Sequence, residues 1–452
     1  MPESSLATLP DIGSPFIAGT RFDLVSVGYE GSEYVFRGSA DAYGPGPGGL
    51  RVVGRADFAT RLLVYRPVDD AAFNGTVWVE WLNVSGGLDA SPDWLFTHTE
   101  LMRRGAAWVG VSAQKIGVEG GGSLIGLASY GLMEVDPARY GALHHPGDRF
   151  SYDIYAQAGA AVGRASGTIL DGLAVERVLA IGESQSAFRL TTYVNEIDPV
   201  TPVYDGFLVH ARGRAAAPLD DEKEPAEALR GGPVLFGDDL RVPVLCVSSE
   251  TDLMTLGYLD ARQDDGDALV TWEIAGTAHG DMYTFVVGPM DSGTVPVEDL
   301  AAAWRPVSEV YGMGLDKLVN AGPQHYVMNA AVSQLDGWVA SGTRPAASPR
   351  LAMRDGTFVT DDHGNVKGGI RTPHVDVPTA VLSGMGNSGH PVAYLCGTTT
   401  PFDAPKLYAL YRSKDDYIDR FTAATDSARE GGFILADDAA EIIGIATLNA
   451  PF

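Results

Sequence analysis

Cysteine is nearly absent from this chain of 452 residues, which contains only Cys246 and Cys396. Two cysteines exclude a disulfide framework and a four-cysteine zinc site. Cys246 lies within the apolar run 242–247, so we interpret it as a buried core thiol rather than a reactive one.

Positive charge is also scarce: the chain has 32 Lys and Arg residues against 58 Asp and Glu residues, and its formal net charge is −26. A chain this acidic repels the phosphates of nucleic acids and the headgroups of anionic lipids. We therefore expect neither a nucleic acid nor a membrane as a partner. We attribute the acidity to solubility, with steering of a cationic substrate as the alternative.

Long apolar runs and cofactor motifs are missing as well. No segment reaches the roughly 18 apolar residues that span a membrane, and residues 1–5 do not begin a secretory signal, so we expect a cytoplasmic protein. No glycine-rich phosphate-binding motif follows a strand, and the pair His144 and His145 lacks the spacing of metal ligands. We expect no cofactor and no metal, and a homo-oligomer is left open.

The chain instead contains short apolar segments that alternate with helical patterns. This alternation is typical of an α/β fold with a mostly parallel central sheet and helices on both faces. A β-rich segment precedes it and a long C-terminal segment follows it. The predicted parallel strands cover residues 76–82, 107–111, 177–181, 206–209 and 244–247.

We predict a single domain over residues 1–452. Its core covers about residues 60–290, and residues 291–452 form a C-terminal extension. This extension and the glycine-rich connection 117–146 are candidates for a lid, because long loops in compact domains are usually functional or mobile.

The most informative motif is Gly182-Glu183-Ser184-Gln185-Ser186. An apolar strand runs into Gly-x-Ser-x-small and then into a helix, which is the setting of a nucleophile elbow. The turn is so tight that the residues two positions before and after the serine must be small, as Gly182 and Ser186 are. We predict Ser184 as the nucleophile, the alternative being a serine that only caps the helix.

A serine nucleophile needs a histidine base that a third group orients. In this fold the acid and then the histidine follow the serine along the chain. His279 has the best setting, because it closes a small-residue loop directly after the predicted strand 270–274, and His325 is the second choice. Both Glu250 and Asp252 follow the preceding strand. We favour Asp252, which lies deeper in the loop, and keep Glu250 as the alternative acid.

Acyl transfer creates an oxyanion that needs preorganised N–H donors. We predict the backbone N–H of Gln185 as one donor and that of Val84 or Ser85 as the other. Gly86 and Gly87 would allow a substrate to approach this second loop closely. A plain glycine turn is an equal alternative for the loop.

These motifs resemble those of the α/β-hydrolase superfamily, and more specifically the actinobacterial-type "alpha/beta hydrolase domain" family of esterase-like serine hydrolases. The resemblance spans most of the chain and implies an α/β-hydrolase core with a triad of Ser184, Asp252 and His279. It says much less about the substrate, since this fold hosts many chemistries. The matching segments are 80–87, 145–148, 151–154, 182–186, 275–279 and 368–373.

We therefore expect a serine hydrolase that cleaves a small-molecule carboxylic ester or lactone through an acyl-enzyme. Because His279 is the base, activity should fall as the pH drops through the histidine pKa, nominally about 6.5. One alternative is amide or peptide hydrolysis or acyl transfer on the same triad. Another is a non-catalytic binding protein that keeps the fold.

Overall fold

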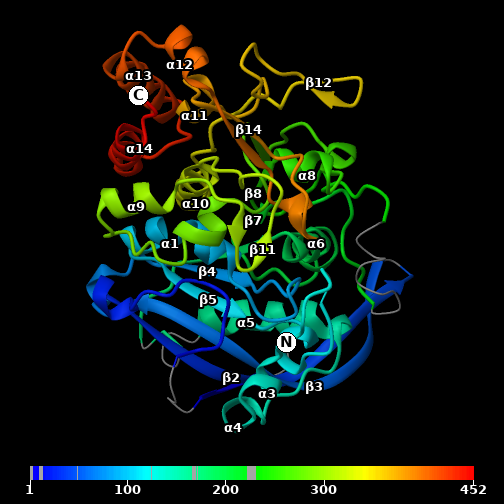
Figure 1. Cartoon of the computed structure of the whole chain (residues 1–452). Helices are drawn as coiled ribbons and strands as arrows, with labels where there is room; N and C mark the ends of the chain where they lie inside the picture. Colours follow the sequence, from blue (N-terminus) through cyan, green and yellow to red (C-terminus); the bar gives the residue numbers. More distant parts are fainter. Residues whose placement is uncertain are drawn as a thin grey trace.

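A computed structural model describes residues 4–9, 14–47, 49–123, 125–164, 169–170, 172–220 and 231–452 of the chain (Figure 1). Its centre is a nine-stranded sheet in the order β1-β2-β3-β5-β4-β6-β7-β8-β9. The strands are β1 (Ser5–Thr8), β2 (Tyr29–Gly46), β3 (Gly49–Pro67), β4 (Thr76–Trp81), β5 (Ala107–Val111), β6 (Arg177–Glu183), β7 (Gly206–His210), β8 (Val244–Ser249) and β9 (Leu269–Ile274).

The sheet combines a parallel part with an antiparallel edge. Strands β5, β4, β6, β7, β8 and β9 pair in parallel, whereas β1, β2 and β3 pair antiparallel and β3 joins β5. The β-rich N-terminal segment is thus a long hairpin of β2 and β3, which curves along one side of the molecule (Figure 1). The predicted α/β-hydrolase fold class, with its mostly parallel sheet, is confirmed.

Helices cover both faces of the sheet. Helix α1 (Pro92–Arg103) and helix α10 (Gln324–Ser341) belong to the core on one face, and α5 (Ser151–Arg164) and α6 (Gln185–Thr192) to the core on the other. Further α-helices among the described residues are α2 (Lys115–Glu119), α3 (Leu132–Val135), α4 (Pro137–Tyr140), α8 (Glu250–Met254), α9 (Val297–Ala303), α11 (Pro373–Asp376), α12 (Ala404–Leu410), α13 (Lys414–Glu430) and α14 (Ala436–Leu448).

Successive side chains of β4 enter these two cores in turn, as the two-residue period of a strand requires. Trp78 lies in the same core as Trp94 of α1, whereas Trp81 packs against Tyr152 and Tyr155 of α5. Because both faces are covered, every residue of β4 is buried. Between Thr76 and Leu82 the sequence is therefore apolar except at Glu80.

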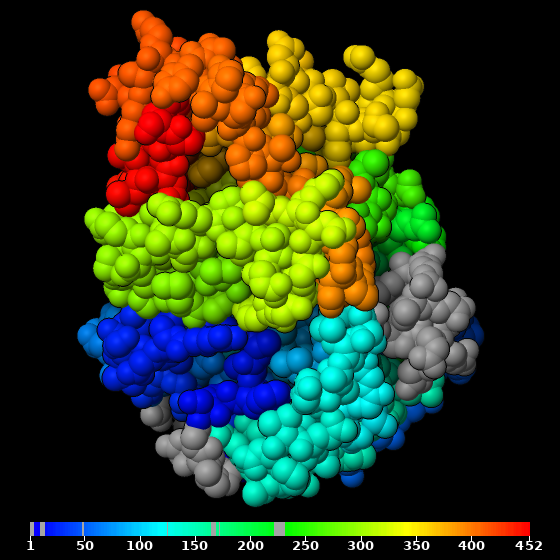
Figure 2. All heavy atoms as spheres, in the orientation of Figure 1, coloured from blue at the N-terminus to red at the C-terminus, as the bar shows by residue number. Residues whose placement is uncertain are grey.

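The chain beyond residue 290 contributes one helix that covers the sheet and further elements that lie beyond it. Helix α10 packs against β6, β7 and β8, so this segment supplies part of the helical layer. The hairpin of β14 (Ala380–Ser383) and β15 (Thr398–Pro401) and helices α11 to α14 form one end of the molecule (Figures 1 and 2). Two small two-stranded pairs, β10 (Glu309–Val310) with β11 (Met313–Gly314) and β12 (Met353–Arg354) with β13 (Thr357–Phe358), also belong to this part of the chain. The division of the chain near residue 290 stays a prediction.

Within the described ranges, no helix combines the length and the apolar character needed to cross a membrane.

Candidate active site

Ser184 stands on the sharp turn between β6 and α6. Its φ of 56° and ψ of −117° lie in a region that residues other than glycine rarely adopt. Its N–H donates to the carbonyl of His210 at 3.0 Å, which ties the turn to the end of β7. In the part of the chain that the structure describes, its side chain makes no capping bond to α6 and instead lines a cavity. The alternative that the Ser184 side chain only caps α6 is therefore not supported.

The turn is as crowded as the motif suggested. A Cβ atom built on Gly182 would lie 3.0 Å from Leu190 Cδ1 and 3.1 Å from Ser186 Cβ. Ser186 itself is fully buried, so a residue larger than serine would have little room there.

Gly182→Ala is expected to lower the free energy of unfolding by about 1–3 kcal/mol, the usual effect of overpacking a buried site. Chemical denaturation of the purified protein measures it. Adding Ser186→Gly removes one of the two close contacts, so the double variant should recover part of the loss. An equal loss in the single and double variants would contradict this steric explanation.

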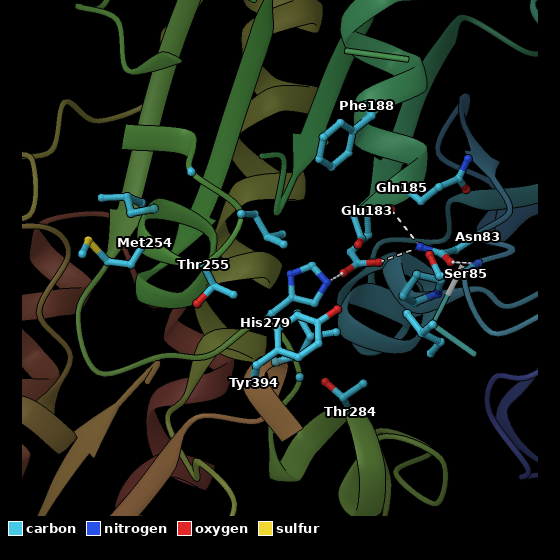
Figure 3. A pocket seen from close by; sticks show the side chains of 18 of the residues that line it. Asn83, Ser85, Glu183, Gln185, Phe188, Met254, Thr255, His279, Thr284 and Tyr394 are labelled. Carbon is cyan, nitrogen blue, oxygen red and sulfur yellow. Dashed lines mark hydrogen bonds and ion pairs between the residues drawn. The ribbon is translucent and has the colours of Figure 1, made fainter. Parts of the chain in front are cut away.

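His279 lies on the loop after β9, and its two ring nitrogens contact two different carboxylates. Nδ1 is 2.7 Å from Asp252 Oδ1. Nε2 is 3.0 Å from Glu183 Oε1 (Figure 3). Asp252 Oδ2 accepts bonds from the N–H and the hydroxyl of Ser249, at 2.6 and 2.8 Å. These bonds fix the Asp252 carboxylate, which in turn fixes the plane of the imidazole ring.

Glu250 has a different set of partners. Its Oε1 accepts from the N–H of Gly276 at 2.6 Å and its Oε2 from the N–H of Gly384 at 2.8 Å. Burial raises the pKa of this carboxyl to about 7. Glu250 therefore joins the loop after β9 to the C-terminal part of the chain, and of the two candidate acids it is Asp252 that contacts His279.

His325, the second choice for the base, lies at the start of α10. Its Nδ1 is 2.6 Å from the carbonyl of Phe96, and its ring stacks on Tyr283 with centroids 3.8 Å apart. Burial lowers the pKa of His325 to about 3. It is fully enclosed and does not line the cavity that holds Ser184 and His279.

The loop after β4 lies beside the nucleophile turn. Asn83 Nδ2 donates to both the carbonyl and Oε2 of Glu183, at 3.1 Å each, and Asn83 Oδ1 accepts from the N–H of Ser85 at 2.8 Å. The N–H of Ser85 is thus already engaged. No described residue accepts a bond from the backbone N–H of Val84 or of Gln185. Of the two predicted donors in the loop after β4, Val84 and Ser85, only Val84 therefore has an N–H that no described residue engages.

A cavity of about 730 Å³ opens in front of Ser184 and His279. Its volume is in the usual range for small-molecule sites, and apolar side chains dominate its wall. Ile125 of the 117–146 connection and Tyr394 of the C-terminal segment both line it, so both candidate lid segments reach the site. In Figure 2 the orange C-terminal residues extend down to the cyan residues of that connection. Further apolar lining residues are Phe96, Phe188, Leu253, Met254, Leu256, Leu259, Phe285 and Leu395.

Three site residues were missed by sequence reasoning, namely Asn83, Glu183 and His210. Asn83 and Glu183 stand inside the motifs already quoted, but the variable position of a motif says nothing about where its side chain points. His210 ends β7 and bonds through Nδ1 to Asp93 Oδ1 at 2.8 Å, and burial lowers its pKa to about 4. A polar residue at the end of a predicted parallel strand was the available signal for it.

The neighbouring histidines 144 and 145 order a loop. The backbone N–H of His145 donates to Glu119 Oε1 at 2.8 Å, and its Nε2 lies 2.9 Å from the carbonyl of Ala113. Among the residues that the structure describes, no cluster of three or more His, Cys, Asp or Glu side chains is arranged to hold a metal ion.

Comparisons with known proteins found similar solved structures and a matching family model. One of two fungal esterases from Rhizomucor miehei is 12% identical, with 68% of this chain and 85% of that chain covered and a TM-score of 0.32. A thermostable esterase from Pseudomonas putida ECU1011 is 14% identical, with 56% and 75% covered and a TM-score of 0.29. A search of curated proteins found no match. The model of the alpha/beta hydrolase domain family matches residues 3–444, so the predicted family is confirmed and the chain belongs to it.

Proposed function

We propose that this protein is a serine hydrolase that cleaves a carboxylic ester or lactone, with Ser184, His279 and Asp252 as its triad. The observation that carries the proposal is the geometry around His279. Its Nδ1 is held by Asp252 at 2.7 Å, and its ring lines the same cavity as Ser184, which stands on a strained elbow. A base that is held by a buried acid and shares a cavity with a serine is the arrangement that nucleophilic acyl transfer needs.

The proposed reaction proceeds through an acyl-enzyme. His279 Nε2 takes the proton of the Ser184 hydroxyl while Oγ bonds to the carbonyl carbon, and Asp252 stabilises the imidazolium that forms. The N–H groups of Gln185 and Val84 hold the oxyanion; Ser85 would serve only after releasing Asn83. His279 then returns the proton to the leaving alcohol, and a water molecule activated in the same way releases the acid.

The cavity wall favours an apolar substrate. Phe188, Leu253 and Phe285 are among the side chains that line it, and they would contact the acyl or the alcohol part of an ester. Burial of such groups supplies most of the binding energy in pockets of this kind, while a few polar groups orient the substrate.

A fluorophosphonate probe and a substrate panel test the proposal. We expect the probe to label the purified protein once, on the peptide that carries Ser184, as measured by mass spectrometry. We also expect simple aliphatic esters and lactones to be cleaved faster than the matching amides. Faster cleavage of amides would favour the amidase alternative, and the absence of both labelling and turnover would favour a binding protein.

A further inference from the structure

Glu183 directly precedes the proposed nucleophile, yet its side chain faces the proposed base. Its Oε1 lies 3.0 Å from His279 Nε2, and the dashed line between the two side chains marks this pair in Figure 3. Only 6% of Glu183 is exposed. Nε2 is the ring nitrogen that Asp252 leaves free, so it is the atom that must take the proton of Ser184.

The position of the Glu183 carboxylate is built into the site. Asn83 Nδ2 donates to its Oε2 and to its backbone carbonyl, at 3.1 Å each. Within the described chain, no group forms a hydrogen bond with the hydroxyl of Ser184, whereas both ring nitrogens of His279 are engaged. The resting base is therefore turned toward a carboxylate.

Two carboxylates flank the imidazole, and this favours its charged form. An ionised carboxylate can only accept, so Asp252 and Glu183 together call for an N–H on each ring nitrogen. Burial lowers the pKa of His279, but Glu183 and Asp252 more than offset this effect and the pKa rises to about 9. Burial raises the pKa of Glu183 to about 7, against the opposing effect of His279. Between these values the pair is an ion pair.

The other titratable groups near the pair do not neutralise it. His210, at the end of β7, is bonded to Asp93 of α1 at 2.8 Å, and because burial lowers its pKa to about 4 it is uncharged near pH 7. Burial raises the pKa of Asp93 well above its usual range. At the cavity wall, Arg214 pairs with Asp260 at 3.2 Å. Glu183 is the group that contacts Nε2.

We propose that Glu183 is a positioning residue that holds His279 protonated in the resting site, so that acyl transfer starts only after the proton between Glu183 Oε1 and His279 Nε2 has left. This inference rests on the proposed function. The departing proton passes to solvent water, and the lone pair that it leaves on Nε2 accepts the proton of Ser184. The acid side of the activity profile therefore lies well above the pH of about 6.5 expected for an ordinary histidine.

The pH dependence of kcat/KM for an uncharged aliphatic ester tests this in the full-length protein and in Glu183→Gln. The amide oxygen of glutamine can still accept the bond from Asn83, but it carries no charge. We expect the acid limb to move down by one pH unit or more, which raises the rate at pH 6.5, relative to each protein's own maximum, about tenfold or more. An acid limb that stays in place, or moves up, would overturn the proposal.

Glu250→Gln is the matched control, because Glu250 is also buried with a pKa raised to about 7 but bonds to Gly276 and Gly384. Its acid limb should coincide with that of the parent protein. A shift of equal size in this variant would show that the loss of any buried carboxylate moves the profile, and it would overturn the assigned role of Glu183.

A titration of His279 that needs no turnover tests this inference independently of the proposed reaction. In Ser184→Ala protein with isotope-labelled histidines, NMR should show the His279 ring titrating above pH 8, and at lower pH after Glu183→Gln is added. A His279 ring that titrates near or below 6.5 with Glu183 present would refute the inference even if the second variant does not fold. If the ring titrates as expected but the parent protein cleaves no ester, it is the proposed function that fails.

Discussion

Ser184→Ala is expected to lower kcat/KM for ester hydrolysis by about 10³-fold or more and to abolish fluorophosphonate labelling. The reason is chemical, because alanine offers no nucleophile, while the cavity, the oxyanion donors and the pair of His279 and Asp252 remain. Steady-state kinetics with an aliphatic ester measure the loss. The fold should survive, since the side chain of Ser184 makes no hydrogen bond within the described residues.

Ser186→Ala is the matched control for this experiment. Ser186 lies two residues further along, is fully buried, and its hydroxyl has no hydrogen-bond partner in the described part of the chain. We expect this variant to keep most of the activity. If Ser184→Ala stayed folded and fully active, the proposed reaction would be wrong.

Asp252→Asn is expected to lower kcat by about 10⁴-fold, the size of effect found when the acid of a Ser-His-Asp triad loses its charge. The amide group can place a donor against His279 Nδ1, which then favours the tautomer with its proton on Nε2. That tautomer cannot accept the proton of Ser184. Activity assays at saturating ester, with circular dichroism to check the fold, measure the effect.

Glu250→Gln tests which of the two candidate acids, Glu250 or Asp252, supports His279. Because Glu250 accepts bonds from two backbone N–H groups, its amide variant loses one of them, so its main effect should be a lower free energy of unfolding. A variant of Glu250 with normal stability but a 10⁴-fold loss, beside an active Asp252→Asn, would reverse the assignment.

The sequence was informative where a signal is local. Apolar runs identified β4, β6 and β8, and parallel strands end at one edge of a sheet, so the residues that follow them lie near one another. Ser184 and His279 do line one cavity, and Asp252 contacts His279. Small residues around Ser184 indicated the turn, because steric crowding there depends on only a few neighbours.

Other features depend on contacts that no local pattern encodes. The contact between Glu183 and His279 joins a variable motif position to a loop almost a hundred residues later. The hydrogen bond from the Ser85 N–H to Asn83 Oδ1 depends on the rotamer of Asn83. The residues of helix α10 do not reveal that it covers β6, β7 and β8. An apolar helix face specifies burial, not the surface that buries it.

The place of α10 in the fold has a consequence for how the chain folds during synthesis. The ribosome releases β6, β7 and β8 long before residues Gln324–Ser341, which cover one face of these strands. Until that helix emerges, apolar side chains of the sheet such as Leu179, Leu208 and Leu245 lack their cover. Domains fold as units, and intermediates with uncovered apolar surface aggregate readily. The side chains that close this part of the core therefore come from the last third of the sequence.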